Sequence, residues 1–237
     1  MRLDQFLKEN GYFFSRAKAQ EEIRLAHIKV DGKLILKPSF DIKGTEKIEI
    51  SKDILPYVSR GGLKLEKALD SFNIDPNGCT CLDIGSSTGG FTDCLLQHDA
   101  SKVYALDVGT SQLHKSLLKN PKVVSIENTN FLTVDLSIFD RLDLIVIDVS
   151  FTKVEPILER IIRNFKDVTV IFLIKPQFEL GKLFLKNGVV KDEKMRIYAI
   201  KQITSFLSNY NIKLNPVIES PIKGGSGNIE YLSFFKI

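Results

Sequence analysis

The chain has 237 residues, and 43% of them are hydrophobic, which is enough for one large domain or for one domain with a smaller attachment. No apolar run approaches the roughly 20 residues that a membrane-spanning helix needs. Residues 1–11 alternate charged and apolar side chains where a signal peptide needs an unbroken apolar run. We therefore expect a soluble, cytoplasmic protein without stable membrane association.

The net charge of +4 is unevenly placed along the chain. Residues 1–67 hold 14 Lys and Arg against 10 Asp and Glu, so they carry the whole excess. Such asymmetry indicates a surface that faces a polyanion, although an ordinary solvated surface would also account for so small an excess.

Cysteine and histidine are sparse. Cys79, Cys81 and Cys94 and the three histidines do not have the number or spacing of a disulfide framework or a metal site. We expect the cysteines to be small buried hydrophobic residues, and we expect no bound metal.

Residues 1–58 have the pattern of a small α+β domain, because helical spacing of apolar residues gives way to strand-like alternation. The expected elements are a helix over 2–11 that stops at Gly11, a helix from 16 with Ser15 as its N-cap, and strands within 27–37 and 41–50, the first turning at Asp31-Gly32.

These pieces resemble the S4-like RNA-binding domain of ribosomal proteins. The resemblance rests on RLDQFL, SRAKAQEEI, HIKVDGK and IKGTEKIEI, with Thr45 and Glu46 where that family usually has an aspartate. It implies that basic side chains here contact RNA phosphates, which position a protein without reading sequence. The RNA-binding candidates are Arg2, Arg16, Lys18, Arg24, Lys29, Lys33 and, just beyond the domain, Arg60.

Residues 59–237 are expected to form a second domain of α/β class. Strand-like apolar runs alternate with helix-length segments, which favours a parallel sheet with helices on both faces. The last two apolar stretches are too close together for a helix between them, so we expect them to pair antiparallel. A mostly parallel, seven-stranded sheet that ends in such a pair resembles the sheet of the Rossmann-like methyltransferases. The runs are 79–85, 102–108, 123–128, 142–149, 168–174, 213–220 and 229–237.

A glycine-bearing loop follows the first of these runs, in CLDIGSSTGGFTDCLL. It lacks the second glycine of the dinucleotide fingerprint, since Ser87 stands there. It resembles instead the DxGxxxGG loop around the amino-acid part of S-adenosylmethionine, and Asp107 ends the next strand where an acidic residue accepts from ribose hydroxyls. The cofactor-binding candidates are Asp83, Gly85, Ser86, Ser87, Thr88, Gly89, Gly90, Asp107 and Asn130, the last expected to face the adenine.

Lys175 directly follows the apolar run VTVIFLI. A lysine at a strand end commonly extends its ammonium to solvent, but this one is part of a larger set near the expected carboxyl edge of the sheet. The set resembles the Lys-Asp-Lys-Glu catalytic residues of FtsJ-like ribose 2'-O-methyltransferases, and its members are Lys64, Asp148, Lys175 and Glu230. The charged residues Asp143 and Lys67 are expected to be structural or solvated.

With the S4-like segment, the whole chain resembles the TlyA family, whose members carry a hemolysin name and methylate cytidine ribose in ribosomal RNA. The resemblance implies S-adenosylmethionine as cofactor and ribosomal RNA in ribosomal subunits as partner. A ribose hydroxyl is protonated at neutral pH, so the enzyme must orient it and help its proton to leave. We expect Lys175 to contact the hydroxyl, Asp148 and Glu230 to hold the lysines, and Lys64 to orient the ribose.

Other functions remain open at this stage. They are a membrane-active hemolysin, a non-catalytic RNA-binding or ribosome-assembly factor, and a methyltransferase with another RNA substrate. The sequence does not identify the nucleotide, the ribosomal subunit, the oligomeric state or the neutral lysine. A hinge near residues 52–62, with Gly61-Gly62 beside Lys64, is a further expectation.

Overall fold

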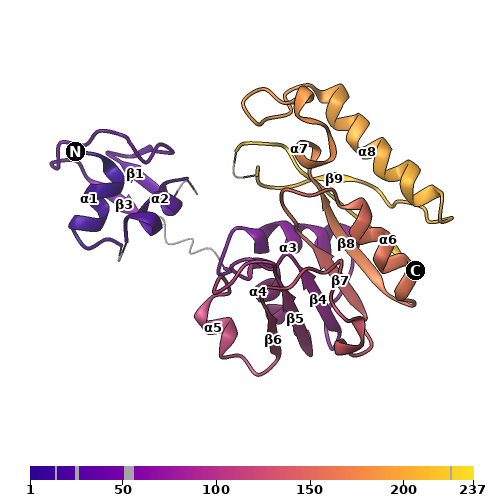
Figure 1. The fold of residues 1–237 in the computed structure, drawn as a ribbon. Coiled ribbons are helices and arrows are strands. Elements are labelled where there is room, and N and C mark those ends of the chain that lie inside the picture. The colour runs from indigo at the N-terminus through magenta and orange to yellow at the C-terminus, as the bar shows by residue number, and fades with distance from the viewer. Residues whose placement is uncertain (14, 25–26, 51–55, 225) are drawn as a thin grey trace. The chain divides into compact units, whose positions relative to one another are not determined.

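The computed structural model describes residues 1–13, 15–24, 27–50, 56–224 and 226–237. The chain divides into two compact units, Met1–Pro56 and Tyr57–Ile237, which are drawn in Figure 1. The expected hinge near residues 52–62 lies partly in residues 51–55, outside the described residues.

The first unit packs two helices against a small antiparallel sheet of order β2-β1-β3. Ser15 caps the second helix, since its Oγ accepts from the Lys18 backbone N–H at 3.1 Å, and Asp31 and Gly32 both have positive φ, as the expected tight hairpin turn needs. The elements are α1 (Leu3–Glu9), α2 (Arg16–Arg24), β1 (Ile28–Val30), β2 (Lys33–Leu34) and β3 (Ile48–Ile50).

The second unit alternates strands and helices along the chain until the last two strands. Its elements are α3 (Gly61–Phe72), β4 (Thr80–Ile84), α4 (Gly90–Gln97), β5 (Lys102–Leu106), α5 (Lys115–Leu118), β6 (Val123–Ile126), η1 (Leu136–Ile138), β7 (Leu144–Ile147), α6 (Glu155–Asn164), β8 (Thr169–Ile174), α7 (Pro176–Glu179), η2 (Lys182–Phe184), α8 (Glu193–Ser208), β9 (Ile218–Glu219) and β10 (Tyr231–Lys236).

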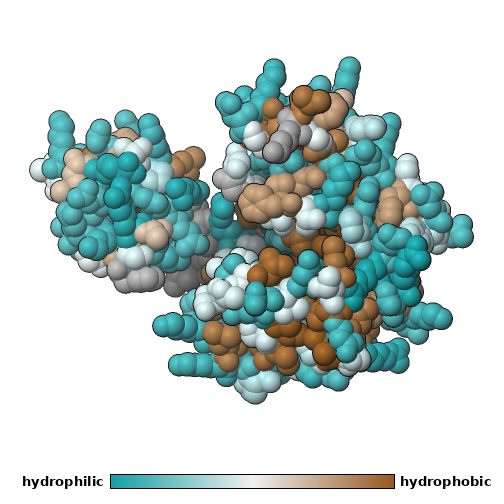
Figure 2. Space-filling view, in the orientation of Figure 1, coloured by the Kyte–Doolittle hydropathy of each residue, from teal (hydrophilic) through white to brown (hydrophobic). Residues whose placement is uncertain are grey.

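The seven strands form one sheet of order β6-β5-β4-β7-β8-β10-β9. Strands β4 to β8 run parallel, whereas β10 is antiparallel to both of its neighbours, β8 and β9. The expected mostly parallel α/β sheet with a final antiparallel pair is confirmed. Figure 2 shows hydrophobic side chains gathered on the sheet half of this unit and mostly hydrophilic ones on the visible face of the first unit.

Successive strand residues enter two different cores, because side chains alternate between the faces of a sheet. On β7, Ile145 and Ile147 pack in a core with α6 and α8, whereas Leu144 and Val146 pack in a core with α3 and α4. Asp148 lies two residues after Val146, so by the same alternation it projects to the face of the sheet that α3 covers.

The same parity applies to the neighbouring strands. Leu173 of β8 and Leu232 of β10 belong to the α3–α4 core. Two residues from them, Lys175 and Glu230 project to the same face. Because β10 is antiparallel, its beginning lies at the edge where β7 and β8 end. The alternation therefore gathers three of the four expected catalytic side chains beside the helix that carries the fourth, Lys64.

Candidate active site

The four charged residues form one connected group at the carboxyl edge of the sheet. Lys175 Nζ lies 2.5 Å from Asp148 Oδ1, and Lys64 Nζ lies 2.7 Å from Glu230 Oε2 and 3.5 Å from Asp148 Oδ2. Asp148 thus links the two lysines, each through a different oxygen. The structure brings together all four residues of the expected set.

The group is almost entirely removed from solvent. Glu230, Lys175 and Lys64 are only 2%, 6% and 7% exposed. Burial by itself would raise the pKa of Asp148, but the ammonium groups of Lys64 and Lys175 outweigh it and hold that pKa below its usual range. Two ammonium groups facing two carboxylates are neutral as a set, which is how charges of this kind are kept in a protein interior.

Three residues outside the expected set support it. Gln177 on α7 donates from Nε2 to Glu230 Oε1 at 2.9 Å, and Lys175 donates to Ser150 Oγ at 3.0 Å. Gly224 leaves room for Glu230, since a Cβ there would meet Glu230 Oε1 at 2.3 Å. The sequence carried little signal for them, because each acts through a contact with a segment distant along the chain.

A cavity of about 490 Å³ opens beside the group, at the carboxyl ends of β4, β5 and β7. Asp148 and Ser150 belong to its lining, so the charged group borders it directly. A volume of this size accommodates a nucleoside-like ligand. The other lining residues are Ile84, Gly85, Ser87, Leu106, Asp107, Val108, Gln112, Asn130, Phe131, Leu132, Val149, Phe151, Thr152 and Ile157.

Four of the nine cofactor-binding candidates lie in this lining. Gly85 has φ +86, and a Cβ there would meet the Asp148 carbonyl oxygen at 2.8 Å, so glycine permits the two strand ends to approach. Asp107 accepts the backbone N–H groups of Ser87 and Gly109, both at 2.7 Å. Asn130 Oδ1 accepts the backbone N–H of Leu132 at 2.9 Å. The Asp107 carboxylate therefore also shapes the glycine-bearing loop.

The remaining candidates of the glycine-bearing loop are placed behind the cavity or at the surface. A Cβ on Gly89 would meet Leu117 Cδ1 at 2.2 Å, and one on Gly90 would meet Ser59 Oγ at 2.3 Å. These glycines permit close packing of α4 against its neighbours. Ser86 is buried and Thr88 is exposed.

Asp83, the first residue of the loop motif, is fully buried on the α4 side of the sheet. Thr92 donates its hydroxyl to Asp83 Oδ2 at 2.7 Å, while Asp83 Oδ1 contacts no hydrogen-bond donor among the described residues. Burial raises the pKa of Asp83 to about 7, with the charge of Asp148 contributing in the same direction. Asp83 supports the strand end from behind the cavity lining.

A second buried carboxyl lies on α7, directly after Lys175 in the chain. Glu179 is 3% exposed, and its Oε1 accepts the Val154 backbone N–H at 3.1 Å. Burial raises the pKa of Glu179 to about 7. This contact ties α7 to the segment that follows β7 and so stabilises the two strand ends that carry Asp148 and Lys175.

The basic candidates of the first unit fall into two groups. Arg24, Lys29 and Lys33 are exposed. Arg2, Arg16 and Lys18 all form ion pairs, the two arginines with Asp4 and the lysine with Glu21 and Glu22. Arg60, in the second unit, is half-buried just before α3.

The residues that were expected to be structural or solvated lie outside the charged group. Asp143 Oδ2 accepts the Thr80 backbone N–H at 2.8 Å at the amino edge of the sheet, and Lys67 is exposed on α3. Cys81 and Cys94 are buried and Cys79 is partly buried. Within the described ranges, no cluster of His, Cys, Asp or Glu has the arrangement of a metal site, and no helix is long and apolar enough to cross a membrane.

Comparison with known families places both units. Residues 57–237 match the FtsJ-like methyltransferase family, and residues 1–48 match the S4 domain. The chain therefore belongs to the FtsJ-like methyltransferases and, within them, to the TlyA family that its sequence indicates.

Several relatives match this chain over nearly its whole length. Hemolysin A of Brachyspira hyodysenteriae is 44% identical, with both chains fully covered. The 16S/23S rRNA (cytidine-2'-O)-methyltransferase TlyA of Mycobacterium tuberculosis is 37% identical over 99% of this chain and 89% of its own. The solved structure of a hemolysin-named protein from Streptococcus thermophilus matches with a TM-score of 0.78 and 36% identity, covering 99% of this chain and 87% of that one.

Proposed function

We propose that this protein transfers a methyl group from S-adenosylmethionine to the 2'-hydroxyl of a cytidine ribose in ribosomal RNA. The observation that carries the proposal is the buried group in which Asp148 links Lys64 and Lys175 beside the cavity. Relatives named as ribosomal RNA (cytidine-2'-O)-methyltransferases, 37% identical over 99% of this chain, support the choice of substrate.

The cavity suits the cofactor in size and in polarity. The Asp107 carboxylate and the Asn130 amide are the lining groups that would hold ribose hydroxyls and adenine, and Gly85 and Ser87 would face the amino-acid part. Apolar residues, among them Leu106 and Phe131, form much of the remaining wall. When bound, S-adenosylmethionine supplies a sulfonium-activated methyl group, so the chain itself needs to orient the acceptor and manage one proton.

Lys175 is the residue we assign to the acceptor hydroxyl. Lys64 contacts two carboxylates, whereas Lys175 contacts one carboxylate and the neutral Ser150 hydroxyl. The ammonium of Lys64 is therefore held more firmly, and Lys175 is freer to exchange its hydroxyl contact for a substrate hydroxyl. Lys175 then directs the proton that leaves the ribose oxygen, and it accepts that proton itself only from its neutral amine form.

The other three residues hold and orient. Asp148 keeps both lysines at the edge of the cavity, and its depressed pKa keeps it ionised across the neutral range. Glu230 fixes Lys64, which we assign to the ribose. An active site closed to bulk water strengthens each of these contacts.

The first unit is proposed to bind structured RNA through basic side chains, as its S4 domain and hydrophilic surface favour. Arg24, Lys29 and Lys33 are exposed and suited to phosphate contacts. Arg60, in the second unit just before α3, is proposed as a further phosphate contact. A ribosomal substrate is consistent with the expected location of the protein in the cytoplasm.

Methyl transfer to isolated ribosomal subunits tests the proposal. Tritium from labelled S-adenosylmethionine should enter the RNA of one or both unmethylated subunits and survive alkali as a resistant dinucleotide. Lys175→Ala should abolish the signal while cofactor binding persists, and Lys67→Ala, which removes an exposed lysine on α3, should leave it unchanged.

Each alternative result has a distinct meaning. Turnover retained by Lys175→Ala would remove Lys175 from the mechanism. An absence of transfer to either subunit, with cofactor bound, would direct the search to other RNAs. An absence of cofactor binding would favour a non-catalytic RNA-binding role.

A further inference from the structure

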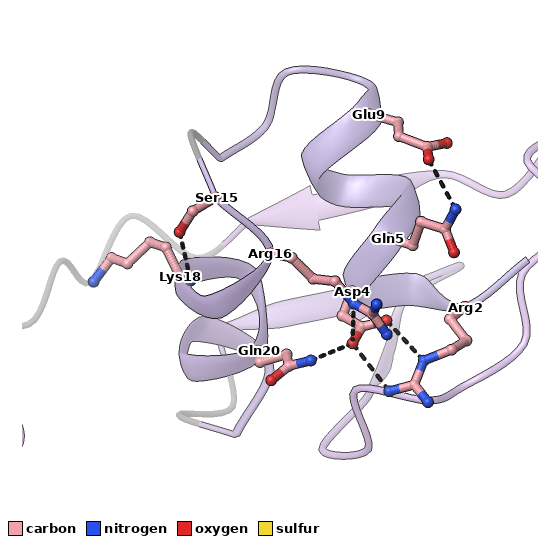
Figure 3. A network of polar contacts seen from close by, with 8 residues as sticks. All are labelled: Arg2, Asp4, Gln5, Glu9, Ser15, Arg16, Lys18 and Gln20. Carbon is pink, nitrogen blue, oxygen red and sulfur yellow. Dashed lines mark hydrogen bonds and ion pairs between the residues drawn. The ribbon is translucent and has the colours of Figure 1, made fainter.

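Two arginines of the first unit meet at one fully buried carboxylate, shown in Figure 3. Arg2 donates from Nε to Asp4 Oδ1 and from Nη2 to Asp4 Oδ2, both at 3.0 Å, and Arg16 donates from Nε to Asp4 Oδ2 at 3.0 Å. Asp4 is 0% exposed, although it lies in the first turn of α1. Gln20 of α2 adds a fourth donor, 2.5 Å from Asp4 Oδ2.

The donors around the Asp4 carboxylate hold it in its ionised form. Burial would raise the pKa of Asp4, but hydrogen bonds from Arg2, Gln20 and Arg16 outweigh it and hold that pKa far below its usual range. These contacts favour the ionised form of Asp4. Asp4 and its two arginine partners together carry one net positive charge, which suits an anionic ligand, and the Asp41 carboxylate also acts electrostatically on Arg2.

The arginines themselves are not buried with it. The side chains of Arg2 and Arg16 are 45% and 48% exposed, so each guanidinium has one edge on Asp4 and another toward solvent. Arg2 commits Nε and Nη2 to Asp4, and Arg16 commits Nε. Among the contacts of the described residues, Arg2 Nη1 and both terminal nitrogens of Arg16 stay available for phosphate oxygens.

The backbone beneath the cluster is fixed as well. Arg2 pairs with Asp41 in an isolated antiparallel bridge, and the Leu3 and Asp4 N–H groups donate to the carbonyls of Phe40 and Pro38. The planar guanidinium fork binds phosphate best when its orientation is set beforehand, because a free arginine loses rotamer entropy on binding.

We propose that Asp4 is a positioning residue for RNA, which holds Arg2 and Arg16 side by side as a preformed phosphate-binding pair. This inference rests on the proposed RNA-binding role of the first unit and deepens it. It makes an unusual prediction, since removing a negative charge from an RNA-binding surface ordinarily strengthens binding.

The test compares two variants with the same change in charge on the same helix. Asp4→Asn removes the buried carboxylate, and Glu9→Gln removes an exposed one that contacts only Gln5 among the residues in Figure 3. Binding of the full chain to unmethylated ribosomal subunits is measured over a series of KCl concentrations. We expect Asp4→Asn to weaken binding about tenfold and to flatten the salt dependence by about one phosphate contact. Glu9→Gln should bind as tightly as the wild type or more tightly.

Two further measurements separate positioning from folding. In a protein that already carries Arg2→Ala and Arg16→Ala, Asp4→Asn should cause no further loss of affinity for subunits, because Asp4 acts through the two arginines. The KM for subunits should rise while kcat stays unchanged. Asp4→Asn binding that equals the wild type, or a further loss in the double-arginine background, would overturn the proposal.

If Asp4→Asn lowers the melting temperature, a second variant separates the positioning effect from a loss of folding. Arg2→Lys/Arg16→Lys keeps both positive charges and Asp4 but removes the planar forks. It should also bind more weakly, and affinity equal to the wild type would overturn the proposal. Failure of the proposed RNA-binding role is distinct, since the wild type would then not bind subunits at all.

Discussion

Lys64 Nζ lies 2.7 Å from Glu230 Oε2, although 166 residues separate the two along the chain. Lys64 projects from α3, and Glu230 precedes β10. Both side chains are buried, so a displacement of Lys64 would leave Glu230 without an ion-pair partner among the described residues, and an unpaired buried charge costs several kcal/mol. The active site should therefore respond to small changes around this pair.

Gly224→Ala should lower activity without touching a charged residue. The added Cβ would meet Glu230 Oε1 at 2.3 Å and push the carboxylate away from Lys64. Since misplacement by about 1 Å can cost a hundredfold in rate, we expect kcat to fall roughly ten- to a hundredfold. Gly181→Ala is the matched control, because a Cβ there meets nothing within 4 Å. Equal steady-state rates for the two variants would show that Glu230 tolerates the shift.

Gln177→Ala should reduce kcat with little change in the KM for the cofactor. The substitution removes the Nε2 donor to Glu230 Oε1, while Gln177 lies outside the cavity lining. We expect roughly a tenfold loss of kcat, about 1.4 kcal/mol. Gln177→Glu should be more harmful, since it places a second carboxylate against Glu230. A rise in cofactor KM with unchanged kcat would contradict this positioning role.

Glu179→Gln should stabilise the protein only at higher pH. Burial raises the pKa of Glu179 from its usual 4.5 to about 7. The folded state therefore binds the proton more tightly, and its stability is full below pH 4.5, declines between pH 4.5 and 7, and stays reduced above. The neutral amide of the variant avoids that loss. The free energy of unfolding of the variant, compared with that of the wild type, should therefore be higher at pH 8 than at pH 5 by on the order of 1–3 kcal/mol.

Urea unfolding at both pH values measures this difference, and comparison with the wild type cancels the titration of Asp83. A stability difference between variant and wild type that is the same at pH 5 and pH 8 would contradict the raised pKa.

Asp107→Asn should weaken cofactor binding by tenfold or more. Both Asp107 oxygens accept backbone N–H groups, from Ser87 and Gly109, and an amide would turn a donor toward one of them. Asp143→Asn is a suitable control, since Asp143 also accepts a backbone N–H, but at the opposite edge of the sheet. Calorimetry should show the affinity loss only for Asp107→Asn, and an equal loss in both variants would point to general destabilisation.

The sheet and its charged group were predictable because they depend on local patterns. Apolar runs indicated the strands, and the family motifs identified Lys64, Asp148, Lys175 and Glu230, which the structure brings together. The strand residues among them share one face of the sheet because alternate residues along a strand point to the same side, and this spacing can be counted in the sequence.

Other parts depend on contacts between distant segments and were not predictable. The close packing at Gly89 and Gly90 is an example, since a Cβ on them would meet Leu117 and Ser59, whose approach no local pattern indicates. Asp4 has the sequence position of an ordinary solvated residue in a first helical turn. Only the packing of α1 against α2 buries it among the arginines.

The antiparallel direction of β10 has a consequence for how the enzyme matures. Its first residues lie at the carboxyl edge beside β8, so Glu230 reaches Lys64 only once β10 has docked in the sheet. Pairings between segments so distant in sequence form late, because the connecting chain must first be ordered. Recovery of methyl transfer during refolding should therefore follow the last sheet-forming step, and activity can serve as a kinetic probe of a completed fold.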